Sequence, residues 1–351
     1  MSSFQIEPNS YIDNNSQTYF IAEIGQNHQG NVELAKKLIL AAKKSGANCV
    51  KFQKSDLNMK FTQKALERPY KNKNSWGNTY GEHKQHLEFT IDEYLELIEY
   101  AKSLNIPLTA SAMDINSVDI LCDQLNVPFL KIGSGDANNF PLIEHAAKKN
   151  VPLVISTGMQ NIETVQKIYE IVTNYHKNFV LMHCVSAYPL PAEDINLKVI
   201  QLYQKMFPDI LIGYSGHELN SDCTIAAVTL GAKIIERHFT LNHFQNGSDH
   251  QCSLTPTTFS KMVSRVRNLE TMLGISKKSF QISELSCAHK LGKSIVMKRS
   301  QSQGHILNED DLVIKVSEPL GINGCELYNI IGKQLKIDLN ADSVVLLEYL
   351  K

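Results

Sequence analysis

Several features that define whole classes of protein are missing from this sequence of 351 residues. Its seven cysteines stand singly and none forms a CxxC pair, which argues against a disulfide framework and against a cysteine zinc site. No apolar run approaches a membrane span, and the polar start of the chain lacks the pattern of a signal peptide. A formal net charge of −1 gives no general attraction to nucleic acid or to a membrane surface. We therefore expect a protein of a reduced, cytoplasmic compartment.

What the sequence does contain is an alternation of short β-branched runs with longer stretches of helical periodicity, such as 31–47 and 90–105. Eight runs are predicted to be strands: 18–24, 47–53, 107–111, 128–134, 152–157, 179–186, 209–215 and 232–240. Eight β/α units within roughly 250 residues are typical of a (β/α)8 TIM barrel. A doubly wound sheet is the alternative, but no GxGxxG motif follows the first run.

The sequence pattern changes after the helical stretch 258–274. From about Leu285 the chain consists of short strand-like runs separated by Gly, Asn and Asp. We expect four parts: an N-terminal extension at 1–17, a catalytic barrel at 18–275, a linker at 276–288 and a small, mostly β domain at 289–351. A domain this small buries little apolar surface, so we expect it to lean on a barrel, of its own chain or of a neighbour.

Polar residues collect near the C-terminal ends of the predicted strands, where the active sites of such barrels lie. They are Glu23, Lys51, Gln53, Thr109, Ser111, Lys131, Ser134, Ser156, Thr157, His183, Ser186, Ser215, His217, Glu236 and His238. Because side chains alternate along a strand, Glu236 and His238 are predicted to point into the barrel mouth, while Ile235 and Arg237 face the helices.

Two inward lysines, Lys51 and Lys131, lie among hydroxyl residues and indicate an anion site. A buried ammonium group needs a partner of opposite charge, which Ser and Thr cannot supply. A small substrate with a carboxylate and a phosphate would satisfy the lysines and the hydroxyls together. For any single one of these residues, a structural ion pair is the alternative.

His217 and His238 lie at the ends of adjacent predicted strands and have acids beside them, a pattern that favours a divalent metal site. So few protein ligands leave positions open for water and substrate, as a catalytic ion requires. The sequence has no HExxH motif, and a histidine packed in the core is the alternative for either residue.

The long connection between the second and third predicted strands has the length of a functional loop. It holds a basic and aromatic cluster made of Lys71, Lys73, Trp76, Tyr80, His83 and Lys84. We expect the side chains of this cluster to be solvated, unless the substrate carries a second phosphate. After the last predicted strand, Asp249 in the run GSDH could bind sugar hydroxyls or could cap a short turn.

Many motifs in order make this sequence similar to the sialic acid synthase family: FIAEIGQNHQG, VKFQ, KIGSGDANNFP, VISTGMQ, SAYPLP, IGYSGHE, ERHFT and GSDH. The resemblance runs from about Phe20 to the end of the chain. The C-terminal runs KLGKSIV, DDLVIKV and IIGKQL resemble the antifreeze-like (SAF) domain fused to those enzymes. The segments NKNSWGNTYGEHKQHLEF and SGDANNFPLIE resemble the animal-type branch, whose members make N-acetylneuraminate 9-phosphate.

The resemblance implies an enzyme that condenses phosphoenolpyruvate with N-acetylmannosamine 6-phosphate and releases phosphate. It also implies a divalent ion, Mn²⁺ or Mg²⁺, with no organic cofactor, and a homodimer in which the small domain reaches over the barrel of the partner. Unphosphorylated N-acetylmannosamine, or a related sugar of the legionaminate or pseudaminate type, is the alternative substrate.

The same resemblance assigns roles to single residues. Positions that match the phosphoenolpyruvate site are Lys51, Thr109, Lys131, Ser134, Ser156 and Ser215. Positions that match sugar contacts are Gln53, Asn74, Tyr188, Asp249 and, from the small domain, Lys293, where an arginine is common. His217 and His238 match the metal ligands, and Glu23, Glu236 and His238 are the catalytic candidates.

Two hypotheses from other classes remain beside the synthase. One is a catalytically silent barrel that binds carbohydrate or ice through its C-terminal domain. The other is an aldolase or hydrolase with a Schiff-base lysine at Lys51 or Lys131.

Overall fold

The computed structural model of the protein describes residues 2–7, 10–187 and 190–351. The chain divides into two compact units, Met1–Gly274 and Ile275–Lys351. The first unit takes in both the expected N-terminal extension and the expected barrel. Within the described ranges, every helix is too short or too polar to pass through a lipid bilayer.

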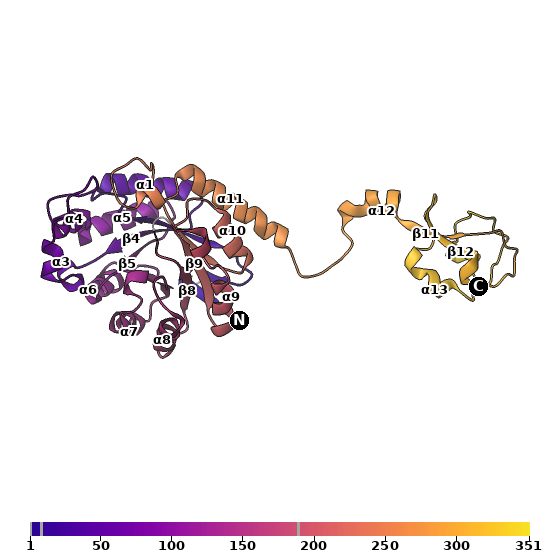
Figure 1. Cartoon of the computed structure of the whole chain (residues 1–351), viewed down its shortest axis with the longest axis horizontal. Coiled ribbons are helices and arrows are strands. Elements are labelled where there is room, and N and C mark those ends of the chain that lie inside the picture. The colour runs from indigo at the N-terminus through magenta and orange to yellow at the C-terminus, as the bar shows by residue number, and fades with distance from the viewer. Residues whose placement is uncertain (1, 8–9, 188–189) are drawn as a thin grey trace. The chain divides into compact units, whose positions relative to one another are not determined.

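The first unit is built around a closed barrel of parallel strands in the order β3 to β10, with β10 paired back to β3 (Figure 1). The strands are β3 (Tyr19–Gly25), β4 (Cys49–Lys54), β5 (Leu108–Ala112), β6 (Leu130–Ile132), β7 (Leu153–Ser156), β8 (Phe179–Cys184), β9 (Leu211–Gly216) and β10 (Ile234–His238). Each falls within or overlaps one of the eight runs predicted as strands, so the predicted (β/α)8 barrel is confirmed.

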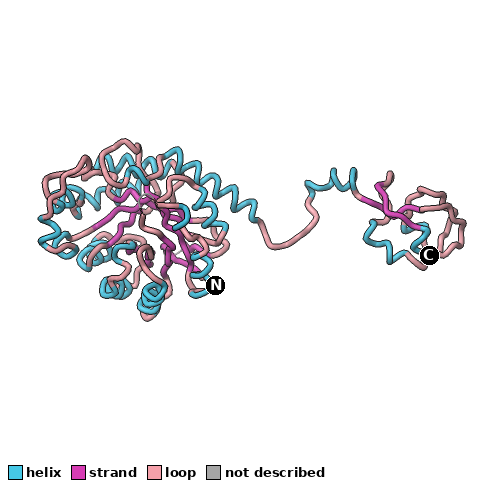
Figure 2. Tube along the Cα trace, viewed as in Figure 1, coloured by secondary structure: helices cyan, strands magenta, loops and turns pink. Residues whose placement is uncertain are grey.

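Helices follow the strands and surround the barrel (Figure 2). They are α1 (Val32–Lys44), α5 (Ile91–Ser103), α6 (Ile115–Asp119), α7 (Phe140–Lys148), α8 (Ile162–Thr173), α9 (Val199–Met206), α10 (Asp222–Thr229) and α11 (Pro256–Leu273). In α1 the side chain of Asn31 caps the first turn by accepting from the Leu34 N–H, and Leu38 and Ala42 are buried one turn apart. The apolar stripe of such a helix packs on the barrel wall and leaves its charged face outside.

An N-terminal hairpin, β1 (Ser3–Glu7) and β2 (Ser10–Asp13), packs against the N-terminal end of the barrel. Its apolar residues join the lowest inward side chains of the strands, and the Phe4 and Phe129 rings meet edge to face at 6.1 Å. We call this group the apolar plug: Phe4, Ile6, Ile12, Ile21, Cys49, Phe129, Val154, Val180, Met182, Leu211 and Ile234. The expected N-terminal extension therefore fills one end of the barrel.

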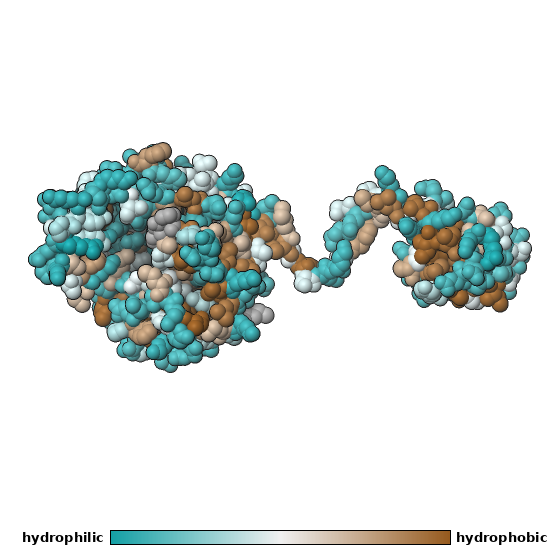
Figure 3. Space-filling model, viewed as in Figure 1, coloured by the Kyte–Doolittle hydropathy of each residue, from teal (hydrophilic) through white to brown (hydrophobic). Residues whose placement is uncertain are grey.

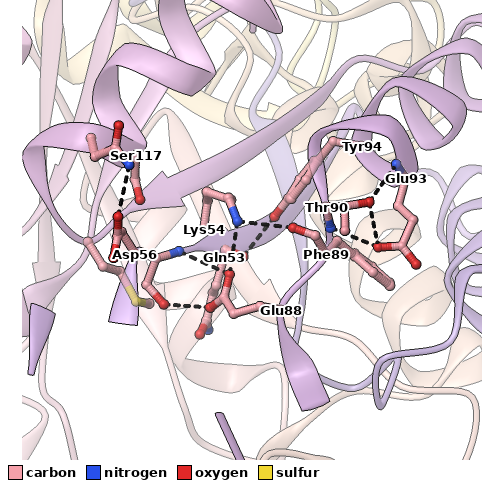
Figure 4. A network of polar contacts seen from close by, with 12 residues as sticks. Gln53, Lys54, Asp56, Glu88, Phe89, Thr90, Glu93, Tyr94 and Ser117 are labelled. Atoms are coloured by element: carbon pink, nitrogen blue, oxygen red, sulfur yellow. Dashed lines mark hydrogen bonds and ion pairs between the residues drawn. The ribbon is translucent and has the colours of Figure 1, made fainter. Parts of the chain in front are cut away.

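The first part of the connection between β4 and β5, residues 55–90 ahead of α5, forms three short helices: α2 (Leu57–Lys60), α3 (Gln63–Glu67) and α4 (Tyr80–Leu87). We call it the β4–β5 insertion. Figure 4 shows how its two ends are tied together, because Lys54 Nζ lies 3.3 Å from a Glu88 carboxylate oxygen and donates to the Phe89 carbonyl at 3.0 Å. The surface over α3 and α4 is mainly hydrophilic (Figure 3).

The second unit has a small core of its own around one antiparallel pair, β11 (Lys293–Met297) and β12 (Leu312–Val316). Two short helices, α12 (Leu285–Leu291) and α13 (Leu327–Ile330), and several isolated β-bridges complete it. The buried Asp311 accepts hydrogen bonds from Gln301 (2.8 Å), the Asn308 N–H (3.0 Å) and His305 (2.7 Å). Short strands of this kind agree with the expected small β domain.

Candidate active site

The C-terminal ends of the barrel strands surround a cavity of about 430 Å³. Eleven of the site residues predicted from the sequence line it: Glu23, Lys51, Gln53, Lys131, Ser134, Ser156, Ser215, His217, Glu236, His238 and Asp249. They come from most of the strands and from the segment that follows β10. The alternation of side chains along each strand therefore brings them to one place, as the sequence predicted.

Two lysines and two glutamates form a buried charged centre at the base of the cavity. Lys51 Nζ lies 2.5 Å from Glu23 Oε2 and 3.8 Å from Glu236 Oε2, while Lys131 Nζ lies 3.6 Å from Glu236 Oε1. Each of the four side chains comes from a different strand, namely β3, β4, β6 and β10. We call Glu23, Lys51, Lys131 and Glu236 the charged centre.

The two lysines of the charged centre are not equivalent. Burial by itself lowers the pKa of both, but Glu23 and Glu236 raise the pKa of Lys51 above its ordinary value. For Lys131 burial prevails and the pKa is lowered. Burial would raise the pKa of Glu236, yet Lys131 and Lys51 lower it, so this carboxyl group is ionised at neutral pH. Lys131 is thus the cation that gains more from an incoming anion.

Hydroxyl groups surround this centre. Ser111 Oγ accepts from Lys51 Nζ at 2.8 Å, and Ser215 Oγ donates to Glu236 Oε1 at 3.3 Å. Ser134 Oγ accepts from the Gly158 N–H at 3.0 Å. The hydroxyl of Ser156 is buried and has no hydrogen-bond partner in the described part of the chain. A buried hydroxyl in that state suits a bound acceptor, such as a carboxylate or phosphate oxygen.

His217 and His238 lie side by side, with ring centroids 5.4 Å apart. His217 Nδ1 is 2.9 Å from the Val185 carbonyl, which can only accept, so the ring proton is on Nδ1 and the lone pair is on Nε2. Burial, reinforced by His238, lowers the pKa of His217 to about 4 and keeps the ring neutral. His238 Nδ1 is buried, has no hydrogen-bond partner among the residues that the structure describes, and lies 3.9 Å from Asp249 Oδ2.

Two imidazole rings placed in this way are fit to bind a divalent cation through their ring nitrogens. Among the described residues, no group of three or more His, Cys, Asp or Glu is arranged to hold a metal ion. A cation held by this pair would therefore keep most of its positions for water and substrate.

Arg237 faces the helices, as the alternation along β10 predicted. Its guanidinium lies 2.9 Å from Glu218 Oε1 and donates to Thr224 Oγ1 at 2.8 Å, while Tyr214 donates to the other oxygen of Glu218 at 3.0 Å. Glu218 directly follows His217. This network fixes the end of β9 and with it the position of the His217 ring.

Four predicted residues are not placed in the cavity wall. Thr109 is buried one layer deeper, where its hydroxyl donates to the Phe129 carbonyl, and Ser111 two residues later lines the cavity in its stead. Asn74, in the β4–β5 insertion, accepts from the Gly247 N–H at 3.2 Å and is not among the lining residues. Lys293 is exposed in the second unit, and Tyr188 lies outside the described residues.

The structure also adds residues that sequence reasoning did not assign to the site. Lys60, Met113, Asp136, Met159 and Cys184 line the cavity. Burial raises the pKa of Asp136 to about 6. Asp136 stands in the motif KIGSGDANNFP after β6, so a third acid near a strand end could have been noticed. Lys60 gave no such signal, because its place depends on how the β4–β5 insertion folds.

Residues 38–278 match the NeuB family. The chain is 50% identical over 341 residues to the N-acetylneuraminate-9-phosphate synthase of Homo sapiens, a match that covers 97% of this chain and 95% of that protein. It is 48% identical over 352 residues to the Drosophila melanogaster protein of the same name, covering 93% and 94% of the two chains.

Among solved structures, the N-acetylneuraminic acid (sialic acid) synthetase of Leptospira borgpetersenii matches with a TM-score of 0.69 and 30% identity. That match covers 82% of this chain and 97% of the solved chain. The sequence similarity and the fold similarity agree, and both extend over most of the chain.

Proposed function

Because this chain belongs to the NeuB family, we propose that it condenses phosphoenolpyruvate with N-acetylmannosamine 6-phosphate to give N-acetylneuraminate 9-phosphate and inorganic phosphate. The observation that carries the proposal is the charged centre with its ring of hydroxyls at the barrel mouth, in a chain 50% identical over almost its whole length to a synthase of that product.

The lysines and hydroxyls bind the three-carbon donor. Lys131, whose pKa burial lowers, and Lys51 bind its carboxylate and phosphate, and the partnerless hydroxyl of Ser156 donates to one of the oxygens. Ser134 and Ser215 lie in the same wall, and Ser111 takes the place first predicted for Thr109.

The two acids stabilise the positive charge that develops during the reaction and accept a proton. When C3 of the enol attacks the open-chain aldehyde, positive charge develops at C2, and the ionised Glu236 stabilises it. Water then adds to C2, and Glu23 or Glu236 accepts the proton that the water loses. That proton is returned to the alkoxide formed from the aldehyde. The C2 hydroxyl then passes its proton to the departing phosphate as the C2–O bond to phosphate breaks, and the keto acid remains.

His217 and His238 would hold a divalent cation, Mn²⁺ or Mg²⁺, which polarises the aldehyde when bound. The chain itself contributes the neutral state and the fixed orientation of the His217 ring, through the Val185 carbonyl and the ion pair of Arg237 with Glu218. The proposal includes no organic cofactor.

On the sugar side, Gln53 and Asp249 lie in the cavity wall and are proposed to bind hydroxyl groups. Asn74, Tyr188 and Lys293 stay predictions for the same substrate. We also propose that the protein acts in the cytoplasm as a homodimer in which the second unit reaches over the barrel of the partner. Exposed apolar side chains in that unit, such as Tyr328 and Leu347, support an interface, and sedimentation of the full chain tests the dimer.

The direct test measures phosphate release by the purified protein with Mn²⁺, phosphoenolpyruvate and the amino sugar. We expect release only when both substrates are present, and faster release with the 6-phosphorylated sugar than with free N-acetylmannosamine. Release that does not depend on a sugar, or no release with any amino sugar, would contradict the proposal.

The other substrates and mechanisms give different results in this assay. Free N-acetylmannosamine or a legionaminate- or pseudaminate-type sugar is less supported, because the relatives at 50% and 48% identity are 9-phosphate synthases. A Schiff-base enzyme would trap pyruvate on Lys51 or Lys131 after borohydride treatment. A silent binding protein would turn over neither substrate.

A further inference from the structure

Three cationic side chains of the β4–β5 insertion lie near one another, two of them against the ring of Tyr80. Lys60 ends α2 and lines the cavity, Lys84 lies in α4, and Arg68 directly follows α3. The guanidinium carbon of Arg68 is 3.9 Å from the centroid of the Tyr80 ring, and Lys84 Nζ is 5.5 Å from it. Lys84 also lies near Asp249 in the cavity wall: burial raises the pKa of that carboxyl group, and His238, the hydrogen bond from Ser248 and then Lys84 lower it.

These three cations lack a carboxylate in direct contact within the described part of the chain. No carboxylate of the described residues forms an ion pair with Lys60, Arg68 or Lys84, whereas the neighbouring Lys54 pairs with Glu88. Lys84 Nζ donates instead to the neutral side-chain carbonyl of Gln26 at 2.7 Å. Burial lowers the pKa of Lys60 and of Lys84, and the carboxylates of Asp136 and Asp249, beyond ion-pair distance, offset this only in part. Lys84 lowers the pKa of Lys60, and Arg68 lowers that of Lys84. Cations that are half-buried without a carboxylate in direct contact are costly, and a bound anion would offset that cost.

The cluster lies apart from the charged centre and reaches its cavity through Lys60, while Arg68 is exposed. Lys51 and Lys131 are each 2% exposed at the base, while Lys60 and Lys84 are half-buried. Lys60 lines the same cavity as the two histidines. An open-chain sugar phosphate has its aldehyde at one end and its phosphate at the other. It therefore needs an anion site in the cavity that is separate from the reacting groups.

The insertion is held in shape before any substrate binds. Figure 4 shows Lys54, Glu88 and Phe89 joined beside Tyr94, whose hydroxyl donates to the Gln53 carbonyl at 2.7 Å. Asp56 caps α2 and accepts from Asn116 Nδ2 at 2.9 Å. Cations on such a fixed segment lose little conformational entropy when they bind an anion.

We propose that Lys60, Arg68 and Lys84 bind the terminal phosphate of the sugar substrate and so select the 6-phosphorylated sugar over the free sugar. This inference rests on the proposed function and names the residues behind its substrate preference. It replaces the sequence expectation for Lys71 and Lys73, which are exposed, and keeps Lys84.

The test compares kcat/KM for N-acetylmannosamine 6-phosphate and for N-acetylmannosamine in four variants: Lys60→Gln, Arg68→Gln, Lys84→Gln and, as a control, Lys64→Gln. Lys64 is an exposed lysine of α3 in the same insertion. For each variant of the cluster we expect kcat/KM for the phosphorylated sugar to fall about 10- to 100-fold, as for a lost charge-assisted hydrogen bond, mainly through KM. We expect kcat/KM for the free sugar and KM for phosphoenolpyruvate to change less than about twofold, which is within the ordinary effect of a surface substitution. The control should match the wild type.

Calorimetric titration with N-acetylmannosamine 6-phosphate gives a readout that does not depend on turnover. Weaker binding by the three variants, with wild-type binding by Lys64→Gln, supports the assignment. Unchanged affinity and an unchanged preference between the two sugars in all three variants overturn it, while the proposed function stands. A wild-type protein that condenses neither sugar overturns the proposed function, and this inference with it.

Discussion

The apolar plug and the charged centre are neighbouring layers of one barrel, built by the same segments two residues apart. The matched pairs are Ile21 and Glu23, Cys49 and Lys51, Phe129 and Lys131, and Ile234 and Glu236. One layer is wholly apolar and packs against a hairpin. The other holds four ionisable groups that burial disfavours and that are balanced mainly by each other.

The difference shows how a strand of period two serves stability and chemistry at once. A step of two residues keeps a side chain inside the barrel, so the same inward face can be apolar at one level and charged at the next. We expect the plug to contribute mainly to the free energy of unfolding, and the charged centre mainly to turnover. The following changes test that division, from the largest expected effect to the smallest.

Replacing Lys51 by Met should nearly abolish turnover and also destabilise the fold. Glu23 would lose its partner at 2.5 Å, and breaking a buried ion pair costs about 3–5 kcal/mol. We expect kcat/KM for phosphoenolpyruvate to fall by at least about 1,000-fold, the size of a lost preorganised charge. The double variant Lys51→Met with Glu23→Gln should recover most of the unfolding free energy in urea and none of the activity. If the double variant recovered both the unfolding free energy and the activity, Lys51 and Glu23 would not take part in the reaction.

Replacing Phe129 by Ala should show the opposite pattern. The ring is fully buried between Phe4 and Tyr19, and deleting a buried Phe costs about 3–5 kcal/mol. Urea unfolding should show this loss, while kcat/KM of the folded fraction stays at the wild-type value. A large fall in kcat/KM would show that the two layers are coupled.

Replacing His217 by Ala should leave the fold nearly intact and lower turnover. The ring is a proposed metal ligand, so we expect its loss to lower turnover at least about 100-fold. That is the upper end of the loss seen when a residue that only supports a metal ligand is replaced. Activity measured against Mn²⁺ concentration, with thermal unfolding alongside, checks both parts. Full activity at an unchanged unfolding temperature would contradict the metal assignment. Glu163→Gln, at an exposed position in α8, provides a remote control.

Asp136→Asn should stabilise the protein at neutral pH. Burial raises the pKa of Asp136 from 3.8 to about 6, so the folded state holds this proton more tightly than the unfolded state. The benefit is present below pH 4 and is lost as the pH rises through 6, where ionisation costs up to about 2 kcal/mol. The variant should therefore unfold at a higher temperature than the wild type at pH 7.5, but not at pH 4. An equal difference at both values would exclude titration of Asp136 as the cause.

The smallest expected effect separates Ser111 from Thr109. Ser111→Ala removes a hydrogen bond to Lys51 and should raise KM for phosphoenolpyruvate several-fold, the effect of about 1 kcal/mol. Thr109→Val should cost a similar amount of stability and leave KM unchanged, since its hydroxyl donates to the Phe129 carbonyl. The reverse result would restore the role first predicted for Thr109.

Strand periodicity was enough to predict the barrel and most of its charged mouth. It could not set the depth of a residue within the barrel, because Thr109 and Ser111 share one inward face and only the three-dimensional register separates them. The first residues are mostly polar, so the alternating apolar residues Phe4 and Ile6 were not recognised as a strand. In the structure they fill the N-terminal end of the barrel.

Lys60 and Arg68 could not be predicted, for another reason. They lie at the ends of the short helices α2 and α3, which meet α4 through contacts such as those of Phe61 and Arg68 with the Tyr80 ring. Local sequence preference does not specify such contacts, and the sequence therefore pointed to the exposed Lys71 and Lys73.

The hairpin packed under the barrel has a kinetic consequence. Because that end is closed, phosphoenolpyruvate must enter from the mouth of the cavity and reach Lys51 and Lys131 by passing the proposed sugar site. A sugar that arrives first would block the way. Initial-rate studies should therefore show compulsory order, with phosphoenolpyruvate as the leading substrate.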